Sequence, residues 1–499
     1  MIPVISVENM RKSDFATIEG GISGKELMRR AAQGVYQSAR WSGKIAIVCG
    51  SGNNAGDGYA LALILKENGY SAEIFRTSSK ASADGAYYLE KCQAQGMNIR
   101  LLKDTDTLKG YDTVVDCILG TGFKGELQAD ISEAVCKINE SGAYVISVDI
   151  NSGLDGDTGL ASCAVKSDLT VSIGTLKHGH LLNQAKDLIG ELKNVDIGIE
   201  IIDTPSHVIE ENDLYGVFAP RKNFSHKGTY GYATLIGGST EYSGAIRLAN
   251  MALSAMRSGA GVIRLCTAKS ICQAVMPHIL EATLYPLDDL DGAIKFNKAQ
   301  IDGALKGARA LAIGMGIGQE SQSYEILDHV LRNYEIPVVI DADGLNALSR
   351  GDKSILKDTK CTPILTPHPA ELARLMGVSV NEILSNPVES AGCFAKEYGV
   401  IVLLKGATTV VADAVGTYLI SRGCAGMATA GSGDVLSGIL LALCAQNPLG
   451  NAQTENAYAA AYINGLAGEL AQAEYGAISM ISSDTVSKIP QAILKISNT

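Results

Sequence analysis

The decisive stretch of the sequence is GMATAGSGD, residues 426–434, a glycine-rich run without charge until it ends in a carboxylate. An apolar run from Val435 to Leu443 follows and is typical of a buried helix. Glycines let a backbone approach a ligand closely, and the first amides of a helix lack partners within it. Together with the helix dipole, such amides favour an anion, most often a phosphate. Asp434 therefore either caps the helix or transfers a proton or binds a metal beside a phosphate. The spacing leaves both interpretations open.

Apolar, strand-like runs alternate with helical patterns on the N-terminal side of this stretch. They are ATLIGG (233–238), GVIRLC (261–266), ALAIGMG (310–316), PVVIDAD (337–343) and VIVLLKG (400–406). The same alternation occurs earlier, in strand-like runs at 44–49, 72–75, 112–118, 144–150 and 168–173 with helical segments near 56–68, 83–95 and 125–140. An amphipathic helix from Gly24 to Arg40 precedes them. This pattern predicts an α/β protein with doubly wound parallel sheets.

The chain has 499 residues, more than one hydrophobic core usually serves, so we expect two domains. Residues 202–231 contain Pro205 and Pro220 and no sustained period, which is typical of a connection between domains. The predicted domains are residues 1–212 and 217–499. The two halves do not share a fixed-period repeat, so an array is excluded.

Composition narrows the class of protein further. A net charge of −11 gives no reason to expect a nucleic-acid partner. Eleven cysteines without CxxC pairs argue against a disulfide framework or a zinc site. No signal peptide or membrane-spanning run is recognisable, so we expect a cytoplasmic protein without a membrane partner.

Polar loops follow three strands of the first half. They are GSGNNAGDG (50–58), GTGFKGE (120–126) and DINSGL (149–154). The first loop reads loosely as a dinucleotide fingerprint with Glu73 at a suitable distance, although Asp57 would repel a pyrophosphate. Ordinary turn chemistry is the alternative for each loop, because Asn, Asp, Ser and Gly dominate turns.

Three hard oxygen donors, Asn54, Asp116 and Ser152, come from neighbouring strand ends. Because the carboxyl ends of parallel strands lie at one edge of a sheet, these side chains could together hold a hard cation. Their convergence favours a site over isolated turns.

GNNAGDG (52–58), VDCILGTGFKGE (115–126) and VDINSGLDGDTG (148–159) resemble the NAD(P)H-hydrate epimerase domain. GMATAGSGD resembles the signature of the ADP-dependent NAD(P)H-hydrate dehydratase domain, a relative of ribokinase-type kinases. Nearly the whole chain is thus similar to the bifunctional NAD(P)H-hydrate repair enzymes. The resemblance implies an N-terminal Rossmann-like domain and a C-terminal ribokinase-like domain.

Enzymes of this family act on reduced nicotinamide cofactors that have added water across the C5–C6 double bond. The resemblance implies that the first domain interconverts the R and S hydrates. The second domain then removes water from the S form with ADP, releasing AMP and phosphate. Asp149 is the candidate acid or base of the first domain, because a carboxylate ending a buried strand should have a raised pKa. Asp434 is the candidate base of the second, taking the proton of the C6 hydroxyl as that oxygen attacks phosphorus.

The family pattern also implies binding residues. The epimerase substrate would contact Asn53, Asn54, Ala55, Gly56, Asp57, Gly120, Thr121, Gly122, Phe123, Lys124, Gly125, Glu126 and Asp149. The dehydratase substrate would contact Ala245, Gly316, Gly318, His368 and Asp434. The nucleotide would lie along Lys405, Gly406, Ala407, Thr408 and Thr409 and along Thr429, Ala430, Gly431, Ser432 and Gly433. A potassium ion is implied on Asn54, Asp116 and Ser152, and a magnesium ion is implied with the nucleotide.

Several of these residues also have an ordinary structural explanation. His368, between two prolines, could be a turn residue with a satisfied ring, and Lys405 could be a solvated lysine. Asp341 and Asp343 could cap the following helix or touch magnesium. Ala55 stands where many relatives have Gly, a small departure that should be tolerated. Ala370 and Asn464 replace the usual Gly and His and leave the substrate geometry open.

Two other functions fit parts of the pattern. A ribokinase-like kinase for a vitamin precursor would share the fold and the anion site but would accumulate a phosphorylated product. A catalytically inactive nucleotide sensor would have no reason to retain both Asp149 and Asp434. The sequence does not show whether the phosphoryl donor is ADP or ATP. The resemblance implies that the protein forms a homo-oligomer.

Overall fold

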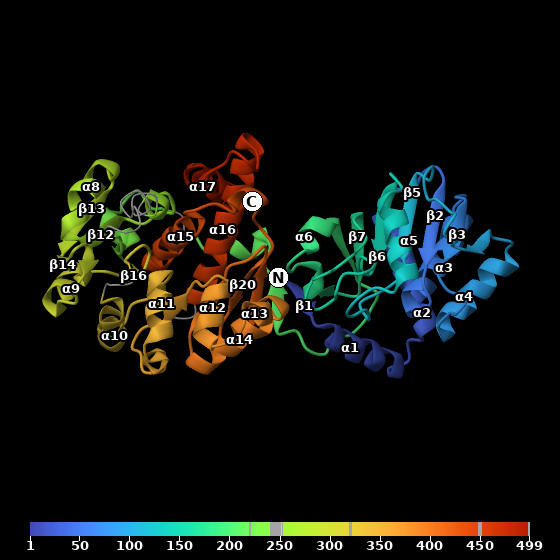
Figure 1. Ribbon diagram of the computed structural model, residues 1–499, viewed down its shortest axis with the longest axis horizontal. Helices are drawn as coiled ribbons and strands as arrows, with labels where there is room; N and C mark the ends of the chain where they lie inside the picture. Colours follow the sequence, from blue (N-terminus) through green and yellow to red (C-terminus); the bar gives the residue numbers. More distant parts are fainter. Residues whose placement is uncertain (219–220, 240–250, 252, 319–321, 448–451, 498–499) are drawn as a thin grey trace. The chain divides into compact units, whose positions relative to one another are not determined.

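The computed structural model describes residues 1–218, 221–239, 251, 253–318, 322–447 and 452–497. It divides into two compact units, Ile2–Ser206 and His207–Thr499, the latter with Met1. The N-terminal unit runs from blue to green in Figure 1 and the C-terminal unit from green to red.

A parallel sheet of seven strands organises the N-terminal unit, in the order β4-β3-β2-β5-β6-β7-β9. Its strands are β2 (Ile45–Cys49), β3 (Ala72–Arg76), β4 (Ile99–Leu101), β5 (Thr113–Cys117), β6 (Tyr144–Val148), β7 (Ser167–Ile173) and β9 (Ile189–Val195). The chain winds outward from β2 to β4 and then returns to β5 on the other side of β2. The ends of β2 and β5 are therefore the switch point where doubly wound sheets bind ligands.

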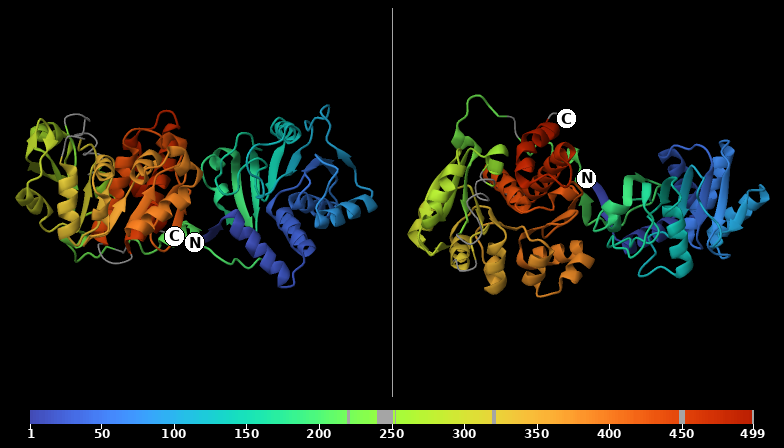
Figure 2. Two further views of the ribbon diagram at one scale, coloured as in Figure 1. Left: turned by 60° about the horizontal axis from the view of Figure 1, so that its bottom comes forward. Right: turned by 45° about the horizontal axis from the view of Figure 1, so that its top comes forward.

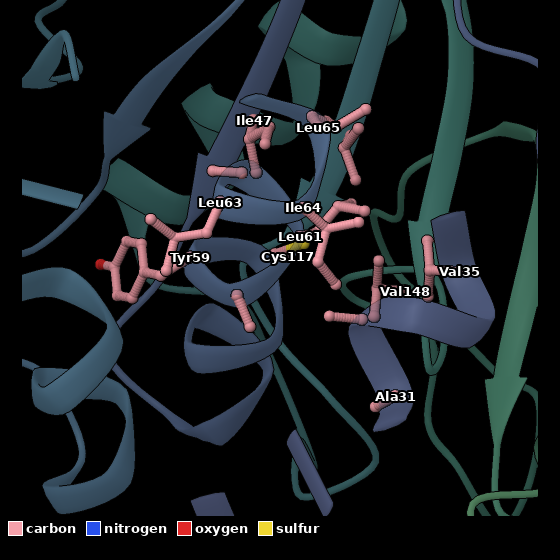
Figure 3. Close-up of a cluster of buried hydrophobic side chains, with 14 of the residues drawn as sticks. Ala31, Val35, Ile47, Tyr59, Leu61, Leu63, Ile64, Leu65, Cys117 and Val148 are labelled. Atoms are coloured by element: carbon pink, nitrogen blue, oxygen red, sulfur yellow. The ribbon is translucent and has the colours of Figure 1, made fainter. Parts of the chain in front are cut away.

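Helices cover both faces of this sheet. They are α1 (Val7–Glu19), α2 (Gly24–Ser38), α3 (Asn53–Glu67), α4 (Ala83–Ala94), α5 (Ala129–Asn139) and the short α6 (Ala185–Leu188). Helices α2, α3 and α4 share one core with the strands, and α5 packs on the other face. Figure 3 shows the first core, in which Leu61 and Leu65 of α3 lie near Ile47 of β2 and Val148 of β6. Since α3 is buried on nearly all sides, its first turn is held firmly at the sheet edge.

The C-terminal unit contains a larger mixed sheet, in which β13-β12-β11-β16-β17-β18-β19 are parallel and β20 and β21 are antiparallel. The strands are β11 (Tyr232–Ile236), β12 (Val262–Ala268), β13 (Ala282–Leu287), β16 (Ala310–Ile313), β17 (Val338–Ile340), β18 (Pro363–Leu365), β19 (Ile401–Leu404), β20 (Thr409–Ala412) and β21 (Thr417–Ile420), with a small hairpin of β14 (Asp289–Leu290) and β15 (Ala293–Ile294). This arrangement confirms the predicted α/β class.

The helices of this unit flank its sheet. They are α8 (Cys272–Val275), α9 (Lys298–Leu305), α10 (Ser323–Asn333), α11 (Asp343–Arg350), α12 (Pro369–Met376), α13 (Val380–Ser385), α14 (Pro387–Tyr398), α15 (Ser432–Gln446), α16 (Ala452–Tyr475) and α17 (Ser482–Ser497). Helix α15 is apolar and buried from Asp434 to Ala445. Helices α15, α16 and α17 lie side by side, and the red helices remain adjacent in both views of Figure 2. This packing fixes the N-terminus of α15 at the carboxyl edge of the sheet.

The connection differs from the sequence prediction in having local structure. It contains β10 (Ser206–Val208) and the 3-10 helices η2 (Glu211–Leu214) and η3 (Lys227–Tyr230). The Ile209 amide donates to the carbonyl of Leu419 in β21, so this segment is paired and is not a free linker. The other 3-10 turns are η1 (His178–His180), η4 (Lys269–Ile271), η5 (Met276–His278), η6 (Lys353–Leu356) and η7 (Ala425–Met427). We propose that the boundary between the two domains lies between residues 212 and 217.

Candidate active sites

A cavity of about 510 Å³ opens at the switch point of the N-terminal sheet. Its wall includes eight of the predicted epimerase residues, namely Asn53, Asn54, Asp57, Gly120, Thr121, Gly122, Phe123 and Asp149. The remaining five lie outside the wall: Ala55 and Gly56 are buried in α3, and Lys124, Gly125 and Glu126 continue the loop beyond Phe123. Lys124 pairs with Asp157 at 3.1 Å. The cavity also takes side chains from α1 and α2, which the sequence reading did not assign to a site.

Asp149 is held at the end of β6 in a left-handed backbone conformation, with a φ of 66°. This conformation is costly for a residue with a Cβ and often marks a functional position. Its carboxylate accepts hydrogen bonds from the Lys177 ammonium at 2.7 Å and from the Thr121 amide at 3.2 Å. Lys177 is 1% exposed, and its ammonium also donates to the Ile173 carbonyl at 2.7 Å. The Asp149 carboxylate is therefore positioned by three strand ends.

The predicted pKa direction of Asp149 is wrong. Burial does raise the pKa of this carboxyl, as the sequence argument assumed. The charge of Lys177, its hydrogen bond and the Thr121 amide together outweigh burial, so the pKa of Asp149 lies below its usual value. The sequence argument failed because Lys177 follows a different strand, some 28 residues further along. Asp149 is thus an ionised carboxylate, suited to act as a base.

His180 adds a second support beneath Asp149. Its Nδ1 accepts the Lys177 backbone amide at 3.0 Å, so the proton of the neutral ring is on Nε2. That Nε2 donates to the Asp149 carbonyl at 2.7 Å. Burial lowers the pKa of His180 to about 4, which keeps this tautomer neutral. His180 therefore holds the strained backbone of Asp149 in place.

The three predicted cation ligands meet beside the cavity. Asp116 is fully buried and accepts Ser152 Oγ at 2.5 Å. Asn54 Nδ2 and Ser152 Oγ both donate to the Leu119 carbonyl, at 2.8 and 3.3 Å. The oxygen of the same amide, Asn54 Oδ1, is buried and has no hydrogen-bond partner among the described residues. An orphaned buried acceptor beside a carboxylate and a hydroxyl fits the donor set that an alkali cation prefers.

The loose dinucleotide fingerprint finds no support. Glu73 lies within β3 and pairs with Arg100 at 2.8 Å and with Tyr111. Its carboxylate is thus satisfied within the sheet and is not presented to a ribose.

In the C-terminal unit, Asp341 links two elements at the carboxyl edge. Its Oδ1 accepts from Lys405 Nζ at 2.9 Å, and its Oδ2 accepts from Ser437 Oγ at 2.7 Å. Lys405 ends β19 and Ser437 lies in α15, so the cluster ties this helix to the sheet. Burial lowers the pKa of Lys405, but the charges of Asp341 and Glu371 outweigh burial and raise it. The lysine is therefore a fixed cation, not a solvated one.

The glycine-rich stretch turns into α15 through Gly431, whose φ is 91°. A Cβ on Gly431 would lie 2.7 Å from Ser482 Oγ, and one on Gly433 would lie 3.4 Å from Lys405 Nζ. Asp434 is 9% exposed in the first turn of the helix. The Ser432 amide donates to the Thr429 carbonyl at 3.3 Å. Since the first helical amides have no intrahelical acceptors, the amides of Gly431 and Gly433 can face an anion close to Lys405 and Asp434.

His368 has a structural role. It N-caps α12, its Nδ1 accepts the Ala370 amide at 3.1 Å, and its Nε2 lies 3.5 Å from Glu371 Oε1. Its ring nevertheless remains 48% exposed, so a ligand can still reach it. Glu371 also lies 3.9 Å from Lys405 Nζ, which connects His368 to the cluster.

The two aspartates of 341–343 are not helix caps in the simple sense. Ala342 occupies the N-cap position of α11, and Asp343 Oδ2 accepts the Gly318 amide at 3.1 Å. This contact joins the glycine loop at 314–318 to the same edge. Gly316 and Gly318 both have positive φ, 61° and 83°.

Other predicted residues lie near this edge or beyond the described structure. Gly406, Ala407, Thr408 and Thr409 lead from Lys405 into β20, and Thr429, Ala430 and Ser432 surround Gly431. Ala245 lies outside the described residues. The sequence reading missed Asp14, Lys177, His180, Glu371 and Ser437 as site residues, although LKHGH (176–180) follows a strand and carries three ionisable side chains.

Within the described ranges, no group of three His, Cys, Asp or Glu side chains is arranged to hold a metal ion. All eleven cysteines belong to these ranges and are free thiols. No helix in this part of the chain has both the length and the apolar character needed to cross a membrane.

Comparison with known proteins covers both units. Residues 24–179 match the family described as YjeF-related protein N-terminus, and residues 233–491 match NAD(P)H-hydrate dehydratase. The bifunctional NAD(P)H-hydrate repair enzyme Nnr of Coxiella burnetii is 32% identical over 492 residues, covering 95% of this chain and 96% of its own.

Solved structures resemble the C-terminal unit. The ADP/ATP-dependent NAD(P)H-hydrate dehydratase of Bacillus subtilis, co-crystallised with ATP and Mg²⁺, is 32% identical with a TM-score of 0.50 and covers 58% of this chain and 98% of its own. A ribokinase-like superfamily protein of Enterococcus faecalis, 21% identical with a TM-score of 0.50, covers 60% of this chain and 99% of its own and supports the ribokinase-like fold. The chain therefore belongs to the family of bifunctional NAD(P)H-hydrate repair enzymes.

Proposed function

We propose that the N-terminal unit interconverts the R and S hydrates of NADH and NADPH and that the C-terminal unit dehydrates the S form with ADP. The observation that carries this proposal is the buried Asp434 carboxylate in the first turn of α15, next to the Lys405–Asp341–Ser437 cluster. A carboxylate beside an anion site is repulsive unless it accepts a proton, and a substrate hydroxyl can supply one.

Dehydration starts with the C6 hydroxyl of the S hydrate. Asp434 takes its proton while the oxygen attacks the terminal phosphorus of ADP, and the bond from that phosphorus to the bridging oxygen breaks so that AMP leaves. The amides of Gly431 and Gly433 and the Lys405 ammonium stabilise the charge on the transferred group. The C6–O bond then breaks as the N1 lone pair moves in, phosphate leaves with the former hydroxyl oxygen, and loss of the C5 proton restores the double bond. Magnesium would enter with the nucleotide phosphates, whose charge it neutralises.

Epimerisation proceeds without a phosphoryl donor. The N1 lone pair expels the C6 hydroxyl as water, and a second water returns on the other face of the ring. Asp149, held ionised by Lys177, is suited to deprotonate the water that returns. The cavity of about 510 Å³ is within the usual range of ligand pockets and can enclose a nicotinamide ring.

We further propose that a potassium ion binds to Asn54, Asp116 and Ser152. The orphaned Asn54 Oδ1 supports this assignment, because a cation would satisfy it. When bound, the ion would contribute positive charge next to the substrate's phosphates. The protein should bind the hydrate more tightly in potassium than in sodium buffer, and equal affinity in both would contradict the proposal.

The direct test is incubation of the full chain with purified S hydrate and either ADP or ATP. Dehydration restores the near-ultraviolet absorbance of the reduced nicotinamide and releases one phosphate per hydrate consumed. We expect a higher rate with ADP. A stable phosphorylated product would instead identify a kinase.

A further inference from the structure

Six ionisable side chains line the N-terminal cavity, and the proposed mechanism uses only Asp149 and Lys177. Asp149 and Lys177 form the ion pair described above, whereas Asp14 and Asp57 contribute two further carboxyl groups to the same wall. Epimerisation needs two proton-transfer groups, because one oxygen must leave protonated while another arrives and loses a proton.

We infer that Asp14, on α1, is the second catalytic carboxyl group of the epimerase and works as the counterpart of Asp149. This inference rests on the proposed epimerase function and deepens it. Asp14 comes from a helix that packs outside the sheet, whereas Asp149 comes from a strand end. The two groups therefore reach the cavity from different elements.

The placement of α1 supports this role. Met10, Asp14 and Ile18 are spaced four residues apart, and all three line the cavity. They form one face of the helix, with Asp14 between two apolar side chains. Among the described residues the Asp14 carboxyl group has no hydrogen-bonding or ion-pair partner, so no structural contact accounts for it here. Its oxygens are free to meet a ligand.

The surroundings of Asp14 and Asp149 shift the pKa values of their carboxyl groups in opposite directions. Burial raises the pKa of Asp14 to about 6; Lys177 opposes this shift and the charge of Asp149 adds to it. Asp149 has a lowered pKa because Lys177 is in direct contact with it. Arg11 and Asp84 also face the cavity. Such a divided pair is the usual arrangement of a general acid and a general base.

The balanced step assigns a role to each group. Protonated Asp14 gives its proton to the departing C6 hydroxyl, the C6–O bond breaks with its electron pair on oxygen, and the N1 lone pair forms a double bond to C6. A water on the opposite face then adds to C6, its proton passes to ionised Asp149, and the pair returns to N1. Exchange with solvent resets both groups, and the reverse reaction uses them in exchanged roles.

Asp57 is less suited to this exchange. Burial raises its pKa well above the usual value, and the charges of Asp149 and Asp14 add to the shift. The raised pKa favours its protonated form, which can donate a hydrogen bond to a ligand. Asp14, with a pKa near the working pH, can both give and accept.

The experiment compares Asp14→Asn with the wild-type chain, with Glu19→Gln as the matched control. Glu19 ends the same helix, is exposed and loses the same charge in its variant. We expect Asp14→Asn to lower the kcat of R–S interconversion by at least about a hundredfold with little change in KM. The wild-type decline of kcat/KM above a pH of about 6 should disappear. Asp14→Glu should restore part of the rate.

Three readouts keep the outcomes separate. Thermal unfolding of the same preparations, together with ADP-dependent dehydration of the S hydrate, reports whether both units of the chain are folded. Interconversion by Asp14→Asn at the rate and with the pH profile of Glu19→Gln would overturn the inference. Failure of the wild-type chain to interconvert the hydrates would instead refute the proposed epimerase function.

Discussion

At the scale of single residues, each unit has a carboxylate beside an ammonium group at the proposed site. Asp149 pairs with Lys177, and Asp434 lies near Lys405, which Asp341 holds in place. In both units the cation has a second contact, with the Ile173 carbonyl for Lys177 and with Glu371 for Lys405. In the N-terminal unit the charge of Lys177 outweighs burial and lowers the pKa of Asp149, which favours the ionised form that acts as a base.

Replacing Asp434 by Asn should remove the base of the dehydratase alone. The side chain keeps its size but cannot accept the hydroxyl proton, so we expect dehydration to fall by at least about a thousandfold. R–S interconversion should remain at the wild-type rate, because that reaction takes place in the N-terminal unit. Both rates can be followed by chromatographic separation of the two hydrates and the reduced cofactor. Loss of both activities would contradict separate sites.

Removing Lys177 should change the pH dependence of the epimerase. Lys177 lowers the pKa of Asp149, so the variant Lys177→Met should raise that pKa and move the acid limb of the kcat/KM profile to higher pH. We expect a shift of at least about one pH unit. Lys193→Met is the control, since the Lys193 ammonium donates to the Ser38 carbonyl and Lys193 does not line the cavity. An unchanged acid limb would show that Lys177 does not tune Asp149.

Asp14 should also lower stability at neutral pH. Its folded pKa of about 6 exceeds the ordinary value of 3.8, so the folded state binds more protons than the unfolded state between these values. The free energy of unfolding therefore falls as the pH rises through this window. The Asp14→Asn variant does not lose this stability. Above pH 6 its free energy of unfolding should exceed that of the wild type by up to about 2 kcal/mol. Thermal unfolding at a low and a high pH measures the difference, and an equal pH dependence in both proteins would refute it.

At the scale of elements, the start of α15 is the critical feature. Gly431 adopts positive φ and lies against Ser482, so Gly431→Ala should strain the turn and displace the first helical amides. Gly476→Ala is a matched control, because Gly476 has a φ of 79° and open space around its Cα. Both variants should lose about 1–3 kcal/mol from backbone strain. Only Gly431→Ala should raise the KM for ADP, and an equal effect in both variants would argue against an anion site at this turn.

The site residues that could be predicted from the sequence are those on strands and helices that the sequence itself indicated. The apolar runs that became β2, β5 and β6 were recognisable from their composition, so Asn54, Asp116, Asp149 and Ser152 could be placed together at one edge. The helix α1 was missed because its apolar positions are few, and with it Asp14. The ion pair of Asp149 with Lys177 could not be foreseen either, since neither side chain carries a local signal of the other. The pKa of Asp149 was consequently predicted in the wrong direction.

At the scale of the whole molecule, the two units should act on the same metabolite in succession. Asp149→Asn should dehydrate the S hydrate but leave the R hydrate, whereas Asp434→Asn should only equilibrate the two. A mixture of both variants should convert the R hydrate completely, because the S form can diffuse between molecules. Measuring residual R hydrate in the mixture checks this expectation. Failure of the mixture, with each variant active alone, would show that the S hydrate must pass within one chain.

The fate of the hydroxyl oxygen tests the central claim most directly. The S hydrate can be labelled with a heavy oxygen isotope at its C6 hydroxyl and incubated with the wild-type chain and ADP. If that oxygen attacks phosphorus and departs with the phosphoryl group, mass spectrometry will find the label in the released phosphate, one atom for each cofactor restored. Label recovered in water, with unlabelled phosphate, would contradict the account.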